Sequence, residues 1–169
     1  MRFLSIFVIC CVLLCSCNAS EAELFDYQDK EMEFECTFVY DGHENGAKIT
    51  MSAPDENGER ADICIEYKEP AIIGGYTLEK TDGKYIGKMG GVEIPFGEKT
   101  AGAVMLVEKL FALREDMISS IATAENGMTE AQFVSEDMRG CVTMREDGQL
   151  HSIEAAFSDG HNISITMKN

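Results

Sequence analysis

The sequence predicts an α+β fold in which a single strongly curved antiparallel sheet, an unclosed half-barrel, covers one long amphipathic helix. Most of the chain consists of strand-length segments that alternate apolar and polar residues with a period of two, and glycine-containing turns separate them. One stretch, residues 100–123, instead spaces its apolar residues three and four positions apart, as an amphipathic helix does. With 169 residues and no break in composition, the chain is expected to form one folded domain.

The chain begins with a short apolar segment that we interpret as an export signal. Its uninterrupted apolar run, residues 6–14, is shorter than the roughly 20 residues that a membrane-spanning helix needs. The residues Leu14-Cys15-Ser16-Cys17 that follow resemble a bacterial lipobox. That resemblance implies cleavage after residue 16 and a diacylglyceryl group on Cys17, which anchors the protein in a membrane. Two alternatives are a conventional signal cleaved after Ala19 or Ala22, and a disulfide bond of Cys17.

These assignments divide the chain into three parts. Residues 1–16 are the lipoprotein signal peptide, residues 17–30 form a flexible polar tether, and residues 31–169 form the folded half-barrel domain. The domain is therefore expected on the extracytoplasmic face of the cell membrane, held there by its lipid.

The first part of the domain is expected to form an antiparallel meander. Three segments alternate apolar and polar residues: Met32 to Tyr40, Ala47 to Ala53 and Ala61 to Tyr67. The polar runs "DGHENG" and "PDENGE" between them supply turn residues.

The middle of the chain is rich in glycine and predicts short, bent strands. Residues 76–80 and 84–88 form a hairpin pattern around Asp82-Gly83. The pairs Gly74-Gly75 and Gly90-Gly91 interrupt the neighbouring segments. Short strands with glycine kinks are typical of a strongly curved sheet.

Residues 100–123 are expected to form the one helix, with Thr100 as its N-cap and Gly127 beyond its end. Its broad apolar face requires a large hydrophobic surface, and the sheet is the only candidate. A second meander is expected after it, in segments 131–138, 140–146, 150–158 and 162–168.

The charge balance excludes one class of partner. The sequence has 14 Lys and Arg against 30 Asp and Glu, a net charge of −16. An acidic surface of this kind repels phosphate backbones, so no nucleic-acid binding is expected. Nothing in the composition indicates self-assembly, and we expect a monomer.

Three cysteines follow the anchor: Cys36, Cys64 and Cys141. An odd number in an exported chain leaves at least one free thiol. The alternating apolar patterns around Cys36 and Cys141 indicate buried structural thiols. A bridge between Cys36 and Cys64 is an open alternative.

No group of residues predicts an enzyme, a cofactor or a metal site. Ser119-Ser120 lack the glycines of a nucleophile elbow, and Glu33 and Glu35 alternate with the apolar residues of their strand, which favours a solvent face. The acidic runs 41–45 and 55–59 lack the spacing of a calcium loop. The three histidines sit in or close to turns, without the Cys/His spacing of a zinc site: His43, His151 and His161.

The middle segment "P…GGYTLE…DGKY…GGVEIPF" carries a family resemblance, through Pro70, Gly74, Asp82-Gly83 and Ile94-Pro95. Together with the lipobox, the helix and the closing meander, it resembles the lipoprotein carriers and sorting proteins of the LolA/LolB-like fold, especially small lipoproteins from Gram-positive bacteria. The likeness covers residues 30 to 168. It implies a half-barrel whose concave face is covered by helix, with an apolar cavity for acyl chains. The sequence departs from the better-known carriers in having less helix, and none of its arginines can be matched to the arginine of their cavity.

We therefore expect a lipid-anchored, non-enzymatic protein that holds a lipid, an acyl chain or another apolar ligand in a cleft between sheet and helix. The alternative is the same scaffold with a filled core, acting as a surface interaction module that contacts protein or cell-wall polymer. The flexible thioethers of methionine favour an adaptable lining. The residues expected to line the cleft are Phe34, Phe38, Met51, Ile63, Ile65, Tyr67, Leu78, Met105, Phe111 and Met117.

Overall fold

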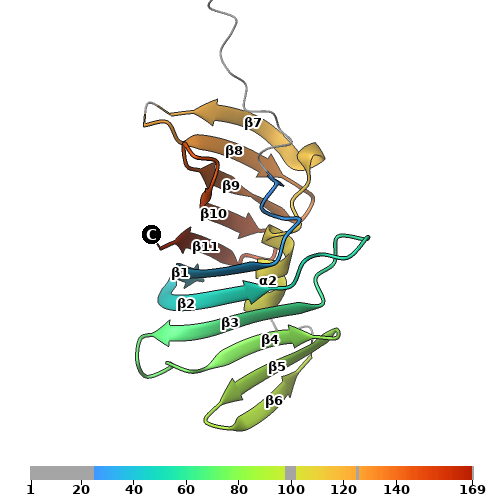
Figure 1. The fold of residues 1–169 in the computed structure, drawn as a ribbon, viewed down its shortest axis with the longest axis vertical. Coiled ribbons are helices and arrows are strands. Elements are labelled where there is room, and N and C mark those ends of the chain that lie inside the picture. Colours follow the sequence, from blue (N-terminus) through green and yellow to red (C-terminus); the bar gives the residue numbers. More distant parts are fainter. Residues whose placement is uncertain (1–24, 98–101, 125, 169) are drawn as a thin grey trace, which may run out of the picture.

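The computed structural model describes residues 25–97, 102–124 and 126–168. It contains one short helix, α2 (Gly102–Leu110), and a single antiparallel sheet of eleven strands (Figure 1). The strands are β1 (Met32–Tyr40), β2 (His43–Met51), β3 (Asp62–Glu69), β4 (Thr77–Thr81), β5 (Lys84–Met89), β6 (Val92–Phe96), β7 (Ile118–Thr123), β8 (Thr129–Val134), β9 (Met138–Met144), β10 (Leu150–Phe157) and β11 (Asn162–Met167).

The strand order explains how the two predicted meanders meet. It is β6-β5-β4-β3-β2-β1-β11-β10-β9-β8-β7, so β1 occupies the middle and β1 to β6 run outward to one edge. After α2 the chain reaches the opposite edge at β7 and returns strand by strand to β11, beside β1 (Figure 1). Among the described strands none joins β6 to β7, so the predicted single unclosed antiparallel sheet is confirmed. Its predicted strong curvature stays a prediction.

The prediction of one long helix over residues 100–123 is wrong in its second half. The helix ends at Leu110, a 3-10 turn covers Glu115–Met117, and Ile118–Thr123 is the edge strand β7. β-branched residues and serines fill that strand and are weak helix formers, while β8 offers it a complete partner, with Ile121 opposite Ala131. The predicted cap Thr100 lies outside the described residues. Within the described ranges, no helix combines the length and apolar character needed to cross a membrane.

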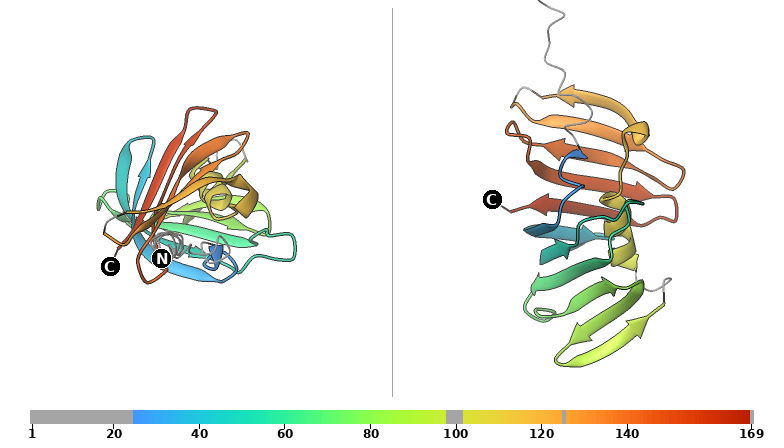
Figure 2. Two further views of the ribbon diagram at one scale, coloured as in Figure 1. Left: turned by 90° about the horizontal axis from the view of Figure 1, so that it is seen from above. Right: turned by 45° about the vertical axis from the view of Figure 1, so that its right-hand side comes forward.

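One face of the sheet packs against α2, and we call it the helix face; the other is the open face (Figure 2). Phe38, Ile49 and Ile65 point from β1, β2 and β3 into the helix face and are fully buried. They pack in one hydrophobic cluster with Val107 and Leu110 of α2. The period-two alternation of these strands therefore marks the buried face as predicted.

Two of the predicted turns have left-handed residues at their tips. Asp41 and Gly42, with φ of 49° and 81°, join β1 to β2, and Asp82 and Gly83, with φ of 48° and 72°, join β4 to β5. Such two-residue turns suit the right-handed twist of hairpin strands. The turn "DGHENG" is therefore shorter than predicted, because β2 already begins at His43.

The three described cysteines are free, so the possible Cys36–Cys64 bridge does not form. Cys36 is opposite Ala47 on β2, which in turn is opposite Tyr67 on β3. Cys64 lies three residues from Tyr67, and an odd separation along a strand places it on the other face. Burial raises the pKa of Cys36 to about 12, which is typical of an inert structural thiol.

An ion pair joins the β1–β2 turn to the β10–β11 turn. His161 Nδ1 lies 2.7 Å from Asp41 Oδ2, and the other oxygen of Asp41 accepts a hydrogen bond of 3.0 Å from the backbone N–H of Asn162. The rings of Tyr40 and His161 stack with centroids 5.6 Å apart. Asp41 thus links the first strand to the last.

This pair predicts a pH dependence. The hydrogen bond to Asp41 raises the pKa of His161, so its contribution to stability is full below about pH 6.5 and is lost as the pH rises through the folded value. Hydrogen bonds from Asn162 and His161 lower the pKa of Asp41, so its contribution is lost as the pH falls through that value. The pair is therefore expected to stabilise the fold most between about pH 4 and pH 6.5.

NMR titration of the imidazole measures this directly. We expect Asp41→Asn to lower the pKa of His161 more than Asp159→Asn does, because Asp159 acts on the imidazole only through its charge, as the weakest of the influences on that pKa. An unchanged His161 pKa in the Asp41 variant would contradict the assignment.

Candidate ligand-binding pocket

The residues expected to line a cleft lie on the helix face and on α2 or the segment that follows it, but most of them pack against one another. Six are buried: Phe38, Met51, Ile63, Ile65, Tyr67 and Phe111. Phe34, Leu78 and Met117 are partly buried at the border of the same cluster, and Met105 is half-buried. Space for a ligand must therefore be sought at the border of this core.

Such a space lies at one end of the helix face. A pocket of about 600 Å³, here called the N-terminal pocket, is bounded by residues 26–34, the end of β11 and the β9–β10 turn. Its apolar side chains include Phe34, Leu150 and Met167, and its basic ones are Lys30, Arg145 and Lys168. Phe34 is the only one of the predicted lining residues that borders it.

The aromatic wall of the pocket continues into the core. The ring of Phe34 stacks on Phe111, just beyond α2, with centroids 5.8 Å apart, and Tyr27 meets the same ring edge-on at 6.0 Å. Burial raises the pKa of Tyr27 to about 12, so its phenol is neutral at physiological pH. These ring contacts therefore join the wall of the pocket to the core at the end of the helix.

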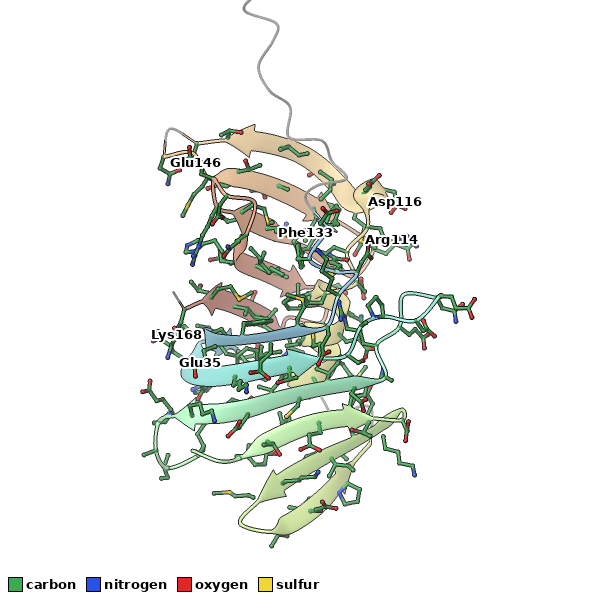
Figure 3. The ribbon with its side chains drawn as sticks, in the orientation of Figure 1. Glu35, Arg114, Asp116, Phe133, Glu146 and Lys168 are labelled. Atoms are coloured by element: carbon green, nitrogen blue, oxygen red, sulfur yellow. The ribbon has the colours of Figure 1, made fainter. Side chains whose placement is uncertain are left out.

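The pocket has three basic side chains, Lys30, Arg145 and Lys168. Within residues 25–97, 102–124 and 126–168, none of Lys30, Arg145 and Lys168 makes an ion pair. Lys168 follows β11 and lies beside Glu35 (Figure 3), to whose carbonyl its backbone N–H donates at 2.9 Å. Of the acidic residues that line the pocket, Glu33 pairs with Lys48 at 2.7 Å.

A buried arginine holds the chain segment that forms one wall. The guanidinium of Arg60 donates to the carbonyls of Gln28, Lys30 and Ser52, with 3.0 Å to Lys30. Only 2% of Arg60 is exposed, and desolvation lowers its pKa. These bonds tie residues 25–30, the described part of the predicted tether, to the body. The proposed lipid site Cys17 and the signal peptide lie outside the described residues.

Two other depressions lie elsewhere on the described structure. One of about 430 Å³ borders Phe111 and Met117 but also the carboxylates of Asp29, Glu59 and Glu108. The other, about 550 Å³, lies on the open face around the backbone of β8 to β11. The N-terminal pocket alone among these three combines partly exposed apolar side chains of the helix face with unpaired cations.

Among the polar groups considered for catalysis, Ser119 has a structural hydrogen bond and His151 has no partner among the described groups. The hydroxyl of Ser119, on the edge strand β7, donates to the carbonyl of Gln132 at 3.2 Å. His151 lies in β10, where its Nδ1 is buried without a partner among the described groups. The described part of the chain holds no cluster of three His, Cys, Asp or Glu side chains placed to bind a metal ion.

The predicted lining omitted the basic residues of the pocket and four of its apolar members, Tyr27, Met32, Leu150 and Met167. Lys30 is separated by more than a hundred positions from Arg145 and Lys168, and the pairing of β1 with β11 and of β11 with β10 brings them together. No local signal marks Arg60 as the residue that fastens the neighbouring segment.

The sequence matches no protein-family model and no curated protein. Three solved structures resemble the fold. A putative outer membrane lipoprotein-sorting protein domain from Vibrio parahaemolyticus has a TM-score of 0.47 at 6% identity, over 88% of this chain and 89% of that one. A LolA superfamily protein from Nitrosomonas europaea has a TM-score of 0.41 at 9% identity, with 88% and 89% covered. A DUF1329 family protein from Desulfovibrio piger has a TM-score of 0.44 at 10% identity, with 88% and 87% covered. Likeness at this level carries no information on function.

Proposed function

We propose that the protein is a carrier or holder of an acyl chain or similar elongated apolar ligand, which enters the N-terminal pocket. The supporting observation is a pocket of about 600 Å³ whose apolar floor is formed by Phe34, Leu150 and Met167. The ring of Phe34 in turn stacks on the buried ring of Phe111. Ligand sites in proteins commonly have volumes of about 300–1,000 Å³. The pocket falls in this range, and its apolar floor is surrounded by polar and charged side chains. Each methylene removed from water there contributes about 0.8 kcal/mol before the costs of binding are subtracted.

The same proposal places the protein outside the cytoplasm. A signal peptide over residues 1–16 and a diacylglyceryl group on Cys17 would hold the domain at the outer face of the cell membrane, where acyl chains are available. The proposal is independent of whether the cell has one membrane or two.

A single charge in the pocket floor tests the binding site. We expect Met167→Glu to weaken the binding of dodecyl maltoside, a neutral twelve-carbon amphiphile, at least tenfold, because the chain would have to displace a solvated carboxylate. Met167 is partly buried in the pocket, whereas Met89, 51% exposed in the β5–β6 hairpin, is the matched control site. Isothermal titration calorimetry below the micellar concentration measures both variants, and circular dichroism checks their fold. Equal binding by wild type and Met167→Glu would place the ligand elsewhere.

The filled-core alternative also has an observation in its favour. Five of the predicted lining residues have at most 2% of their surface exposed: Phe38, Met51, Ile63, Ile65 and Phe111. In that case the domain is a non-enzymatic interaction module that contacts protein or cell-wall polymer. Native mass spectrometry of protein purified without detergent separates the two functions. A co-purifying apolar ligand supports the carrier, and a clean apo mass without binding of any twelve-carbon chain leaves the interaction module.

A further inference from the structure

We infer that the N-terminal pocket selects amphiphiles with an anionic head group, a carboxylate or a phosphate, and that Arg145 and Lys168, aided by Lys30, bind this group. The inference rests on the proposed function, because it specifies the head group of a ligand whose chain occupies the apolar floor. Its basis is the placement of three cations around one apolar pocket.

The basic side chains of the pocket differ in their ion pairing from most lysines elsewhere on the described structure. The chain carries 30 acidic residues against 14 basic ones. Five lysines elsewhere on the described structure are each neutralised by a carboxylate: Lys48, Lys68, Lys80, Lys88 and Lys109. Three of the exposed or half-buried cations that lack an ion pair among the described residues line this one pocket, whereas Lys84 and Arg139, which also lack one, stand singly on β5 and β9.

The same pocket also has acidic side chains. Asp26, Glu31 and Glu33 also line it, and Glu33 is paired with Lys48. Asp26 belongs to the segment that Arg60 fastens and Glu31 follows that segment, whereas Arg145 and Lys168 come from the β9–β10 turn and the end of β11. Arg145 and Lys168 line the same pocket as Leu150 and Met167, and Lys168 lies at its edge, opposite Glu35. On this inference, these cations bind the head of a chain that lies on the apolar floor.

The chemistry of these cations favours an anionic head group. Guanidinium and ammonium groups donate strong, charge-assisted hydrogen bonds to carboxylate and phosphate oxygens. A neutral sugar head gains none of this, and a cationic head is repelled by the three basic side chains. Because the pocket is open to solvent at its charged rim, the preference should weaken with salt.

A set of ligands with one chain length and different heads tests the inference. We expect laurate and dodecyl phosphate to bind at least tenfold more tightly than dodecyl maltoside at low salt, and dodecyltrimethylammonium to bind most weakly. Comparing laurate with dodecyl phosphate distinguishes a carboxylate from a phosphate preference. The difference between laurate and the maltoside should shrink several-fold in 0.5 M sodium chloride, on the order expected when the screening length falls well below 10 Å.

Variants identify the groups responsible. Arg145→Gln combined with Lys168→Gln should weaken laurate binding at least fivefold and leave the maltoside unchanged. Lys84→Gln, which removes an exposed cation in the β4–β5 hairpin, is the control and should change neither ligand. Equal affinity for laurate and maltoside overturns the anionic preference while the proposed function stands. Tightest binding of the cationic amphiphile overturns it in favour of Asp26 and Glu31, and failure of every chain to bind removes the proposed function itself.

Discussion

Replacing Gly140 with alanine is expected to destabilise the protein by about 3 kcal/mol or more, a large part of the roughly 5–15 kcal/mol by which domains are ordinarily stable. A Cβ at this position would lie 1.9 Å from the carbonyl oxygen of Glu154, 2.5 Å from Cζ of Phe133 and 2.9 Å from Cα of Ala155. Two of these three atoms belong to the backbone of β10, so a change of side-chain rotamer cannot relieve the overlap.

The strand register shows why the space is closed. Gly140 of β9 stands opposite Phe133 of β8 on one side and opposite Ala155 of β10 on the other. Phe133 is labelled in Figure 3, is fully buried, and directs its ring over the glycine. An aromatic ring covering a strand glycine is a recognised device for closing the gap that the missing side chain leaves. Over-packing commonly costs about 1–3 kcal/mol, and a backbone obstacle puts this site at or above the upper end.

Urea unfolding followed by circular dichroism measures the effect. Gly97→Ala is the control, because Gly97 has no positive φ and a Cβ there meets nothing within 4 Å. We expect that variant to stay within about 0.5 kcal/mol of wild type. Trimming the ring with Phe133→Leu should not rescue Gly140→Ala, since the Glu154 carbonyl remains. A full rescue would show that the ring, and not the backbone, is the obstacle.

What the sequence could predict depends on how local the cause is. The alternation in Met32–Tyr40 and Asp62–Glu69 identified β1, β3 and their buried faces, because period-two burial is visible within one segment. The spacing of Ile118 and Ile121 fits a helix equally well, and only the partner strand β8 decides for a strand. Edge strand β6 was hidden by Pro95, which a sheet tolerates at an edge.

The pocket likewise depends on residues that are far apart in the sequence. Phe34 could be predicted because it belongs to a regular apolar row. The charges that complete the site could not be placed, because turns far apart in sequence carry them and the pairing of β1 with β11 sets their positions. Burial of Arg60 was equally invisible, because it follows an acidic turn and has no periodic pattern around it.

Replacing Arg60 with methionine is expected to release residues 25–30 from the body and to lower the free energy of unfolding by about 2 kcal/mol. The guanidinium donates hydrogen bonds to three main-chain carbonyls, each of about 1.5–3 kcal/mol because the donor is charged. Removing a buried cation recovers part of its desolvation cost, which offsets much of that sum. The methionine keeps most of the apolar stem, so the loss is assigned to hydrogen bonding.

The local effect should exceed the global one. Hydrogen exchange of the Gln28 amide, which is bonded to the carbonyl of Phe25 at 2.8 Å, should become at least tenfold faster in Arg60→Met, because that turn depends on the arginine for its attachment. Arg114→Met is the matched control, since Arg114 pairs with Asp116 on the surface and is 69% exposed. Because Tyr27 and Lys30 line the N-terminal pocket, Arg60→Met should also weaken binding of a twelve-carbon chain while Arg114→Met does not. Normal exchange at Gln28 together with normal ligand binding would contradict this prediction. It would mean that the ring contact of Tyr27 with Phe111 holds residues 25–30, and that the hydrogen bonds of Arg60 are not needed for their attachment.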